Sequence, residues 1–117
     1  MITFEKFCNE IAHALDAHVS FNSHGDPAIY KDGVQVAWLT NDPGCMLADI
    51  SDIFVDGHAN TRCYIDYDED DGNFYVWDND TTGPGQIFIY CGKRIKTAIK
   101  KALSYNPFTD YDKYPAW

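Results

Sequence analysis

Two alternating segments, residues 62–68 and 73–78, constrain the fold of this chain most strongly. The first places unlike residues on its two sides, with Cys63, Ile65 and Tyr67 opposite Arg62, Tyr64, Asp66 and Asp68. The second places Phe74 and Val76 opposite Tyr75 and Trp77. Successive side chains of a β-strand point to opposite faces. The pattern therefore predicts two strands, and the polar residues 69–72 between them predict the turn of a hairpin.

Helical periodicity appears in three other segments. Residues 4–17 carry an apolar stripe behind Thr3, which is suited to the N-cap position. Residues 93–104 repeat the same kind of stripe. A short helix is expected within 42–54, because Asp42 and Pro43 resemble an N-cap followed by proline at the first helical position. Apolar residues then continue at helical spacing: Met46, Leu47, Ile50, Ile53 and Phe54.

The remaining strands complete an expected α+β fold. A short strand is expected at 18–21, and Asp32-Gly33 between two β-rich runs predicts a hairpin within 28–40. Residues 86–92 read QIFIYCG and predict a strand at the centre of the sheet. We expect an antiparallel sheet of about five strands with two main helices and one short helix, in the order α-β-β-β-α-β-β-β-α.

Length and end segments predict one domain and a cytoplasmic location. A chain of 117 residues is expected to form a single domain over 1–117, with residues 105–117 as an aromatic C-terminal tail. No apolar run is long enough to span a bilayer. The N-terminal residues lack the pattern of a signal peptide. We therefore expect the cytoplasm, or the host cytoplasm if the protein is encoded by a phage.

Charge is distributed very unevenly. The net charge is −9, but residues 7–92 hold fifteen acidic and two basic residues, a local net charge of −13. Residues 93–101 hold five basic residues and no acidic one. An acidic body repels nucleic acid over about one Debye length. Direct nucleic-acid binding is therefore disfavoured, and the basic helix is the one exception.

The cysteines and the acidic run predict neither a metal centre nor a cofactor. The four cysteines lack the close pairs that a zinc site needs. The segment 66–80, DYDEDDGNFYVWDND, fits an EF-hand loop in neither register that we tested. A loose, weak cation site at the DEDDG turn remains an alternative.

One arrangement suggests nucleophilic catalysis. In a helix beginning at Pro43, Cys45 would lie at the N-terminus, where the dipole lowers a thiol pKa. His58 is a candidate base, and Asp78 or Asp80 could orient its imidazole. No family motif surrounds these residues, and a buried cysteine with a loop histidine is the simpler explanation. We therefore expect a protein that is not an enzyme, and keep a small cysteine hydrolase as the third hypothesis.

The acidic hairpin predicts a partner-binding surface. Carboxylates two residues apart on a strand lie about 6.8 Å from each other, a spacing comparable with that of phosphates along a nucleic-acid strand. Combined with aromatic residues, they have the composition of an interface more than of a solubilising surface, which is the alternative. Asp49, Asp52 and Asp56 on the short helix would add to this charge. The candidate partner-binding residues are Asp66, Asp68, Glu69, Asp70, Asp71, Tyr75, Trp77, Asp78 and Asp80.

The general character of the chain resembles that of phage-encoded inhibitors. Small, acidic, aromatic-rich chains without a catalytic motif are similar to anti-CRISPR and anti-restriction proteins, which mimic nucleic acid, and to toxin-immunity proteins. The element order also resembles class I type III secretion chaperones, which are small acidic α+β dimers. The leading hypothesis is an inhibitor that occupies the groove of a basic nucleic-acid-binding protein. The alternative is a chaperone or immunity protein for one polypeptide. A homodimer is also considered, and would depend on the tail aromatics Phe108, Tyr111, Tyr114 and Trp117.

Overall fold

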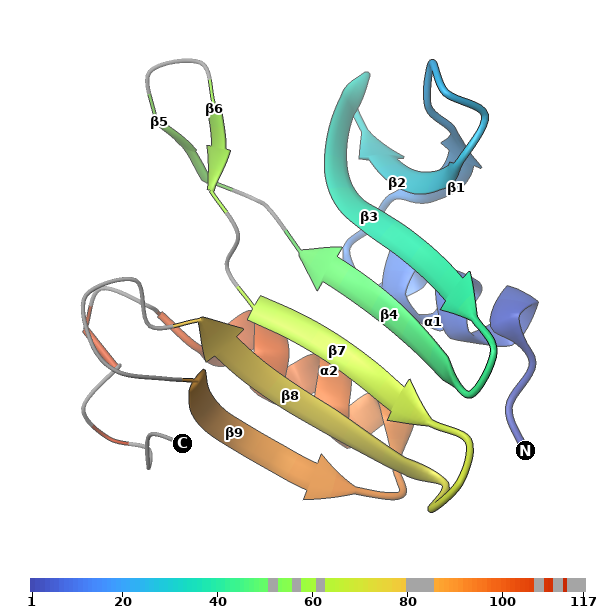
Figure 1. The fold of residues 1–117 in the computed structure, drawn as a ribbon. Helices are drawn as coiled ribbons and strands as arrows, with labels where there is room; N and C mark the ends of the chain where they lie inside the picture. The colour runs from blue at the N-terminus through green and yellow to red at the C-terminus, as the bar shows by residue number, and fades with distance from the viewer. Residues whose placement is uncertain are drawn as a thin grey trace.

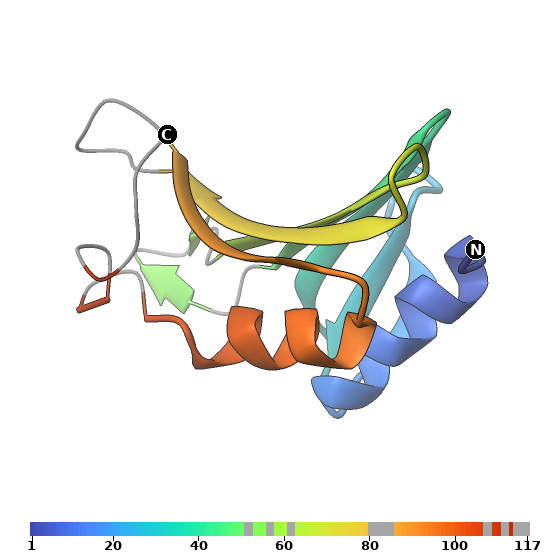
Figure 2. The same ribbon diagram turned by 90° about the horizontal axis from the view of Figure 1, so that it is seen from below.

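The computed structural model describes residues 1–50, 53–55, 58–60, 63–79, 86–106, 109–110 and 113. In these residues the fold is α+β, with one antiparallel seven-stranded sheet and two helices on one of its faces (Figures 1 and 2). The sheet strands are β1 (His18–Phe21), β2 (Pro27–Lys31), β3 (Val34–Asp42), β4 (Cys45–Ile50), β7 (Cys63–Asp68), β8 (Asn73–Asn79) and β9 (Gln86–Gly92). They follow one another across the sheet in chain order. A separate ribbon consists of β5 (Ile53–Val55) and β6 (His58–Asn60).

Both long helices form where the sequence predicts them. Helix α1 (Phe4–Ala14) begins at Thr3, whose Oγ1 accepts a hydrogen bond from the Lys6 backbone N–H at 3.1 Å. It ends three residues earlier than expected, where Asp16 takes a left-handed conformation with φ of 53°. Helix α2 (Ile95–Ser104) buries Ala98, Ile99 and Ala102. Each helix thus turns its apolar stripe to the sheet, as expected for amphipathic surface helices. Neither described helix is long and apolar enough to cross a membrane.

The prediction of a short helix within 42–54 is wrong. The structure instead has a tight β3–β4 hairpin, in which Asp42 pairs with Cys45 and Gly44 has a φ of 90°. Proline followed by a residue with positive φ is the sequence of a type II turn, whereas a helix cannot pass through that φ. Met46, Ala48 and Ile50 are buried, which is period two. A short apolar run fits the period of a helix as well as that of a strand. Here the run forms a strand because it pairs with β3 on one side and with β7 on the other.

Two other expectations about the sheet are corrected. Within the described residues the large sheet has seven strands, because β4 replaces part of the expected helix and because the 18–21 segment pairs with β2. Strand β9 lies at an edge of the sheet and pairs with β8 alone. Its strong β character comes from two apolar sides, since Ile87 and Ile89 are buried toward the helix while Phe88 contacts rings on the other face.

The core lies between the sheet and the two helices. Helix α1 packs over β1, β2 and β4, and α2 packs over β7, β8 and β9 (Figure 2). Phe7 is fully buried and its ring lies 6.4 Å from that of Phe74. Burial of such a side chain contributes roughly 1.5–3 kcal/mol. The hairpin that carries most of the predicted site is therefore held by its inward face, which includes Cys63, Ile65, Tyr67, Phe74 and Val76.

The start of the predicted tail belongs to this core. Tyr105 is 1% exposed, and its hydroxyl donates a hydrogen bond of 2.9 Å to Asp78 Oδ2. Burial, and then the bond to Asp78, raise the pKa of Tyr105. The four aromatic residues on which a homodimer was predicted to depend, Phe108, Tyr111, Tyr114 and Trp117, lie outside the described residues.

Candidate protein-binding face

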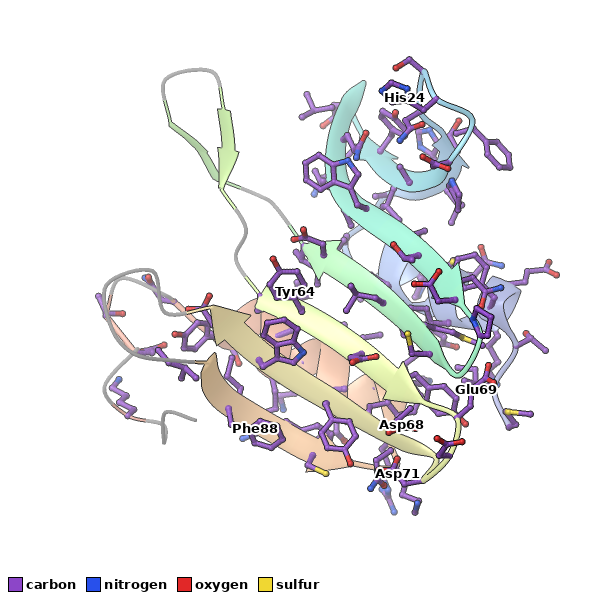
Figure 3. The ribbon with its side chains drawn as sticks, viewed as in Figure 1. His24, Tyr64, Asp68, Glu69, Asp71 and Phe88 are labelled. Atoms are coloured by element: carbon purple, nitrogen blue, oxygen red, sulfur yellow. The ribbon has the colours of Figure 1, made fainter. Side chains whose placement is uncertain are left out.

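The sheet face opposite the helices carries its side chains in cross-strand rows. Strand register aligns one row as Trp38, Asp49, Tyr64, Trp77 and Phe88. The adjacent row holds Thr40, Leu47, Asp66, Tyr75 and Cys91. Figure 3 shows Tyr64, Asp68 and Phe88 on the side facing the viewer, with both described helices behind the sheet. This face therefore combines rings and carboxylates on one rigid surface.

Aromatic rings cluster where β7, β8 and β9 lie side by side. Tyr64 and Trp77 are directly opposite each other, and their rings stack at a centroid distance of 4.2 Å and an angle of 18°. The Tyr75 and Phe88 rings meet edge to face at 5.9 Å and 62°. Such pairs stabilise a sheet beyond the area they bury. These side chains are half-buried, so part of each ring remains accessible to a partner.

Asp66 lies among these rings. It is opposite Tyr75 on β8 and opposite Leu47 on β4. Its Oδ1 atom is buried and has no hydrogen-bond partner among the described residues. Burial, followed by the nearby Asp68 and Asp71, raises the pKa of the Asp66 carboxyl. The charged form of Asp66 is thus poorly compensated within the part of the protein that the structure describes.

The turn between β7 and β8 continues the negative charge, and two carboxylates there, those of Asp68 and Asp71, accept hydrogen bonds. Asp68 Oδ1 accepts a bond of 2.8 Å from the Asp70 N–H. Asp71 accepts from the Asn73 N–H at 2.8 Å and from the Tyr75 hydroxyl, and these bonds lower the pKa of Asp71. The same bond to Asp71 raises the pKa of Tyr75 to about 12. Asp71 is therefore held as a carboxylate and Tyr75 as a neutral phenol.

We call the combined surface the aromatic–acidic face. It consists of the outward residues of β7, β8 and β9 together with the adjoining turn: Tyr64, Asp66, Asp68, Glu69, Asp70, Asp71, Tyr75, Trp77 and Phe88. Seven of its members were predicted from the sequence. Tyr64 and Phe88 were not in the predicted set, although the alternation of their strands places both outward.

One predicted residue, Asp78, does not join this face. Asp78 is 7% exposed and points to the helix side, where Tyr105 binds it. Side chains alternate along β8, so Asp78 points inward like Val76 because Trp77 points outward. The inward direction of Asp78 could therefore have been predicted from the sequence. Asp80 lies outside the described residues. Of the carboxylates expected on a short helix, Asp49 lies on β4 beside Tyr64, and Asp52 and Asp56 lie outside the described residues.

The surroundings of Cys45 do not favour an activated thiol. Cys45 lies on β4, between Asp42 on β3 and Asp68 on β7, and not at a helix N-terminus. Burial first, and then four carboxylates, raise the pKa of its thiol. A nucleophilic cysteine needs the opposite shift. The backbone of His58 belongs to β6 in the separate ribbon. No group of three or more metal-ligating side chains is arranged to hold an ion among the described residues.

The fold and this face define a class of protein, an antiparallel α+β domain with both described helices on one side and an aromatic–acidic surface on the other. No protein-family model matches the sequence, and no curated protein or solved structure is significantly similar to it. The function must therefore be inferred from the face itself.

Proposed function

We propose that the protein binds a basic surface of a nucleic-acid-binding protein through the aromatic–acidic face and thereby keeps nucleic acid out of that site. The observation that carries this proposal is the stacked Tyr64–Trp77 pair with the Asp66 carboxylate in the next row of the sheet and Asp68 one row further along β7. Nucleic acid offers proteins two things, anionic phosphates and the π-faces of bases. The face offers carboxylates and ring faces in their place.

The whole-molecule charge supports the same proposal. A net charge of −9 attracts a basic partner and repels competing nucleic acid. Such long-range attraction raises association rates and makes them sensitive to salt. The alternative, a chaperone or immunity protein for one polypeptide, would use the same face without requiring that the partner bind nucleic acid.

A displacement experiment tests the proposal. The immobilised protein is exposed to heparin-binding proteins from a nuclease-treated cell extract, and each captured protein is then purified. We expect a captured protein to bind a fluorescein-labelled duplex, and we expect the present protein to displace that duplex in an anisotropy titration. Displacement should weaken as NaCl rises.

Matched charge variants complete the experiment. Asp66→Asn with Asp68→Asn should weaken displacement by about tenfold or more, equivalent to about 1.4 kcal/mol. Asp16→Asn with Asp32→Asn should not weaken it, although both pairs change the net charge from −9 to −7. Asp16 and Asp32 have positive φ, which asparagine tolerates well. Captured proteins that bind no nucleic acid, or equal displacement by both double variants, would contradict the proposal.

A further inference from the structure

We propose that the aromatic–acidic face recognises arginine rather than lysine, by holding a guanidinium group of the partner at Asp66 against the neighbouring rings. The inference rests on the proposed function and specifies the side chain through which a basic partner would be bound. It starts from the surroundings of one carboxylate.

Three aromatic residues adjoin Asp66 in the sheet. On β8, Tyr75 is directly opposite Asp66. Trp77 is two residues further along β8, where it pairs with Tyr64, and is the diagonal neighbour of Asp66. Tyr64 is two residues away on β7, about 6.8 Å along the strand. Diagonal neighbours lie about 7–8 Å apart, within reach of long side chains. A planar cation that contacts the Asp66 carboxylate therefore also lies against a ring.

Two neighbouring carboxylates of the hairpin, those of Asp68 and Asp71, accept hydrogen bonds that Asp66 Oδ1 lacks. Asp71 accepts from the Tyr75 hydroxyl and the Asn73 N–H, and Asp68 accepts from the Asp70 N–H. Asp66 Oδ1 has no partner among the described residues. A cation at Asp66 would offset both its burial and the repulsion from Asp68 and Asp71, which together raise its pKa. Of the carboxylates at the β7–β8 hairpin, Asp66 therefore has the most to gain from a partner.

The combination of ring and carboxylate distinguishes the two basic side chains. A guanidinium is planar and stacks on aromatic faces while its N–H groups donate to a carboxylate. An ammonium is a compact, strongly hydrated charge that cannot stack in this way. Carboxylates alone would bind both cations by charge, so the rings must produce any preference.

The probes for this inference are two fluorescein-labelled homopeptides of equal length, one of arginine and one of lysine. Binding is measured by anisotropy at about 50 mM NaCl, where screening is weak. We expect the arginine peptide to bind about tenfold more tightly, which lies within the range of a cation–π contact. Trp77→Leu should reduce this ratio to near one. Asp66→Asn should weaken binding of the arginine peptide.

Trp38→Leu is the matched control. Trp38 lies on the same side of the sheet and is 39% exposed, but β4 and β7 separate it from Trp77. The ratio should survive this substitution. Circular dichroism checks that each variant is folded. As a measurement that needs no folded variant, NMR titration of the unmodified protein with the arginine peptide should shift the Trp77 indole N–H more than that of Trp38.

The outcomes separate this inference from the proposed function. Equal affinity for both peptides would overturn the arginine inference, as would a preference that persists in Trp77→Leu or an indole shift larger at Trp38. If, in addition, the double variant Asp66→Asn with Asp68→Asn binds both peptides more weakly, the face still binds basic partners by charge. Only the preference for arginine is then contradicted. If neither peptide binds, the arginine inference fails, and displacement of duplex DNA from the captured partner then tests the proposed function separately.

Discussion

At the scale of single residues, the carboxylates of the hairpin differ in what surrounds them. Asp71 is stabilised by a phenol and a backbone N–H, and Asp78 is buried against Tyr105. Asp66 is half-buried among rings and close to two other acids. Equal charges in the sequence therefore have unequal consequences, and at Asp66 the surroundings disfavour the negative charge.

We predict that Asp66→Asn stabilises the isolated protein at pH 7 by about 0.5–1 kcal/mol, as removal of unfavourable surface charge commonly does. The folded pKa of Asp66 is raised, so the folded state binds more protons than the unfolded state between the two pKa values. The destabilisation from Asp66 is therefore present above the folded pKa and disappears as pH falls toward the ordinary value of 3.8.

Urea denaturation of both proteins at pH 7 and near pH 4 measures this difference. The gap in free energy of unfolding should shrink at the lower pH. A variant that is less stable than the parent at pH 7 would show that the Asp66 carboxylate is favourably compensated in solution. The same substitution weakens partner binding in the proposed function, so fold and function make opposite demands on this residue.

At the scale of elements, the segment 42–54 shows how pairing overrides a local pattern. Its apolar residues fit a helix and a strand, and its Asp-Pro start favours a helix. Strand β4 is paired on both sides, with β3 and with β7. Backbone hydrogen bonds to two neighbours are not visible in a local window, which is why the sequence prediction was wrong here.

Gly44→Ala distinguishes the two structures of this segment. Gly44 has a φ of 90° in the hairpin, so alanine should destabilise the protein by about 1–2 kcal/mol. In a helix, the same change would be stabilising by roughly 1 kcal/mol. Thermal or urea unfolding measures the sign. Gly44→Asn serves as the control, because asparagine tolerates a positive φ and should cost less than alanine; a stabilised Gly44→Ala protein would contradict the hairpin.

At the scale of the whole molecule, both described helices cover one face of the sheet (Figure 2). The basic residues lie in α2 and just before it, and Lys93 Nζ donates a hydrogen bond of 2.6 Å to the Asp71 carbonyl oxygen in the β7–β8 turn. Lys93, Arg94, Lys96, Lys100 and Lys101 are all exposed. Exposed ion pairs contribute only about 0–1 kcal/mol each, so they would not hold a dimer together by themselves.

We therefore predict that any homodimer depends on residues 107–117 more than on these lysines. A chain ending at Asn106 keeps Tyr105 and its bond to Asp78, and should stay folded but sediment as a monomer. Circular dichroism and sedimentation velocity check the two parts of this prediction. A truncated chain that remains dimeric would assign the dimer contacts elsewhere, and a monomeric full-length chain would contradict the homodimer itself.

Part of the candidate face could be predicted from the sequence because strand alternation is a local property. Tyr75, Trp77, Asp66 and Asp68 were assigned to outward faces from period two alone, and the structure confirms those orientations. Asp78 belongs to the same acidic segment and was therefore predicted as a site residue, although the alternation of side chains along its strand places it inward. Phe88 lies outside the acidic segment 66–80, which contains all of the predicted site residues.

The sequence by itself determined the two amphipathic helices, the inward and outward faces of the 63–78 hairpin and the α+β class, because each depends on a period that neighbouring residues impose on one another. Only the tertiary structure decided that 45–50 is a strand, that β9 is an edge, and that Tyr64, Trp77 and Phe88 adjoin one another. These features depend on which strands pair and in which register. The hydrophobic pattern and the turns restrict register, but the pairing of strands that are distant in the chain, such as β4 with β7, lies beyond any local window.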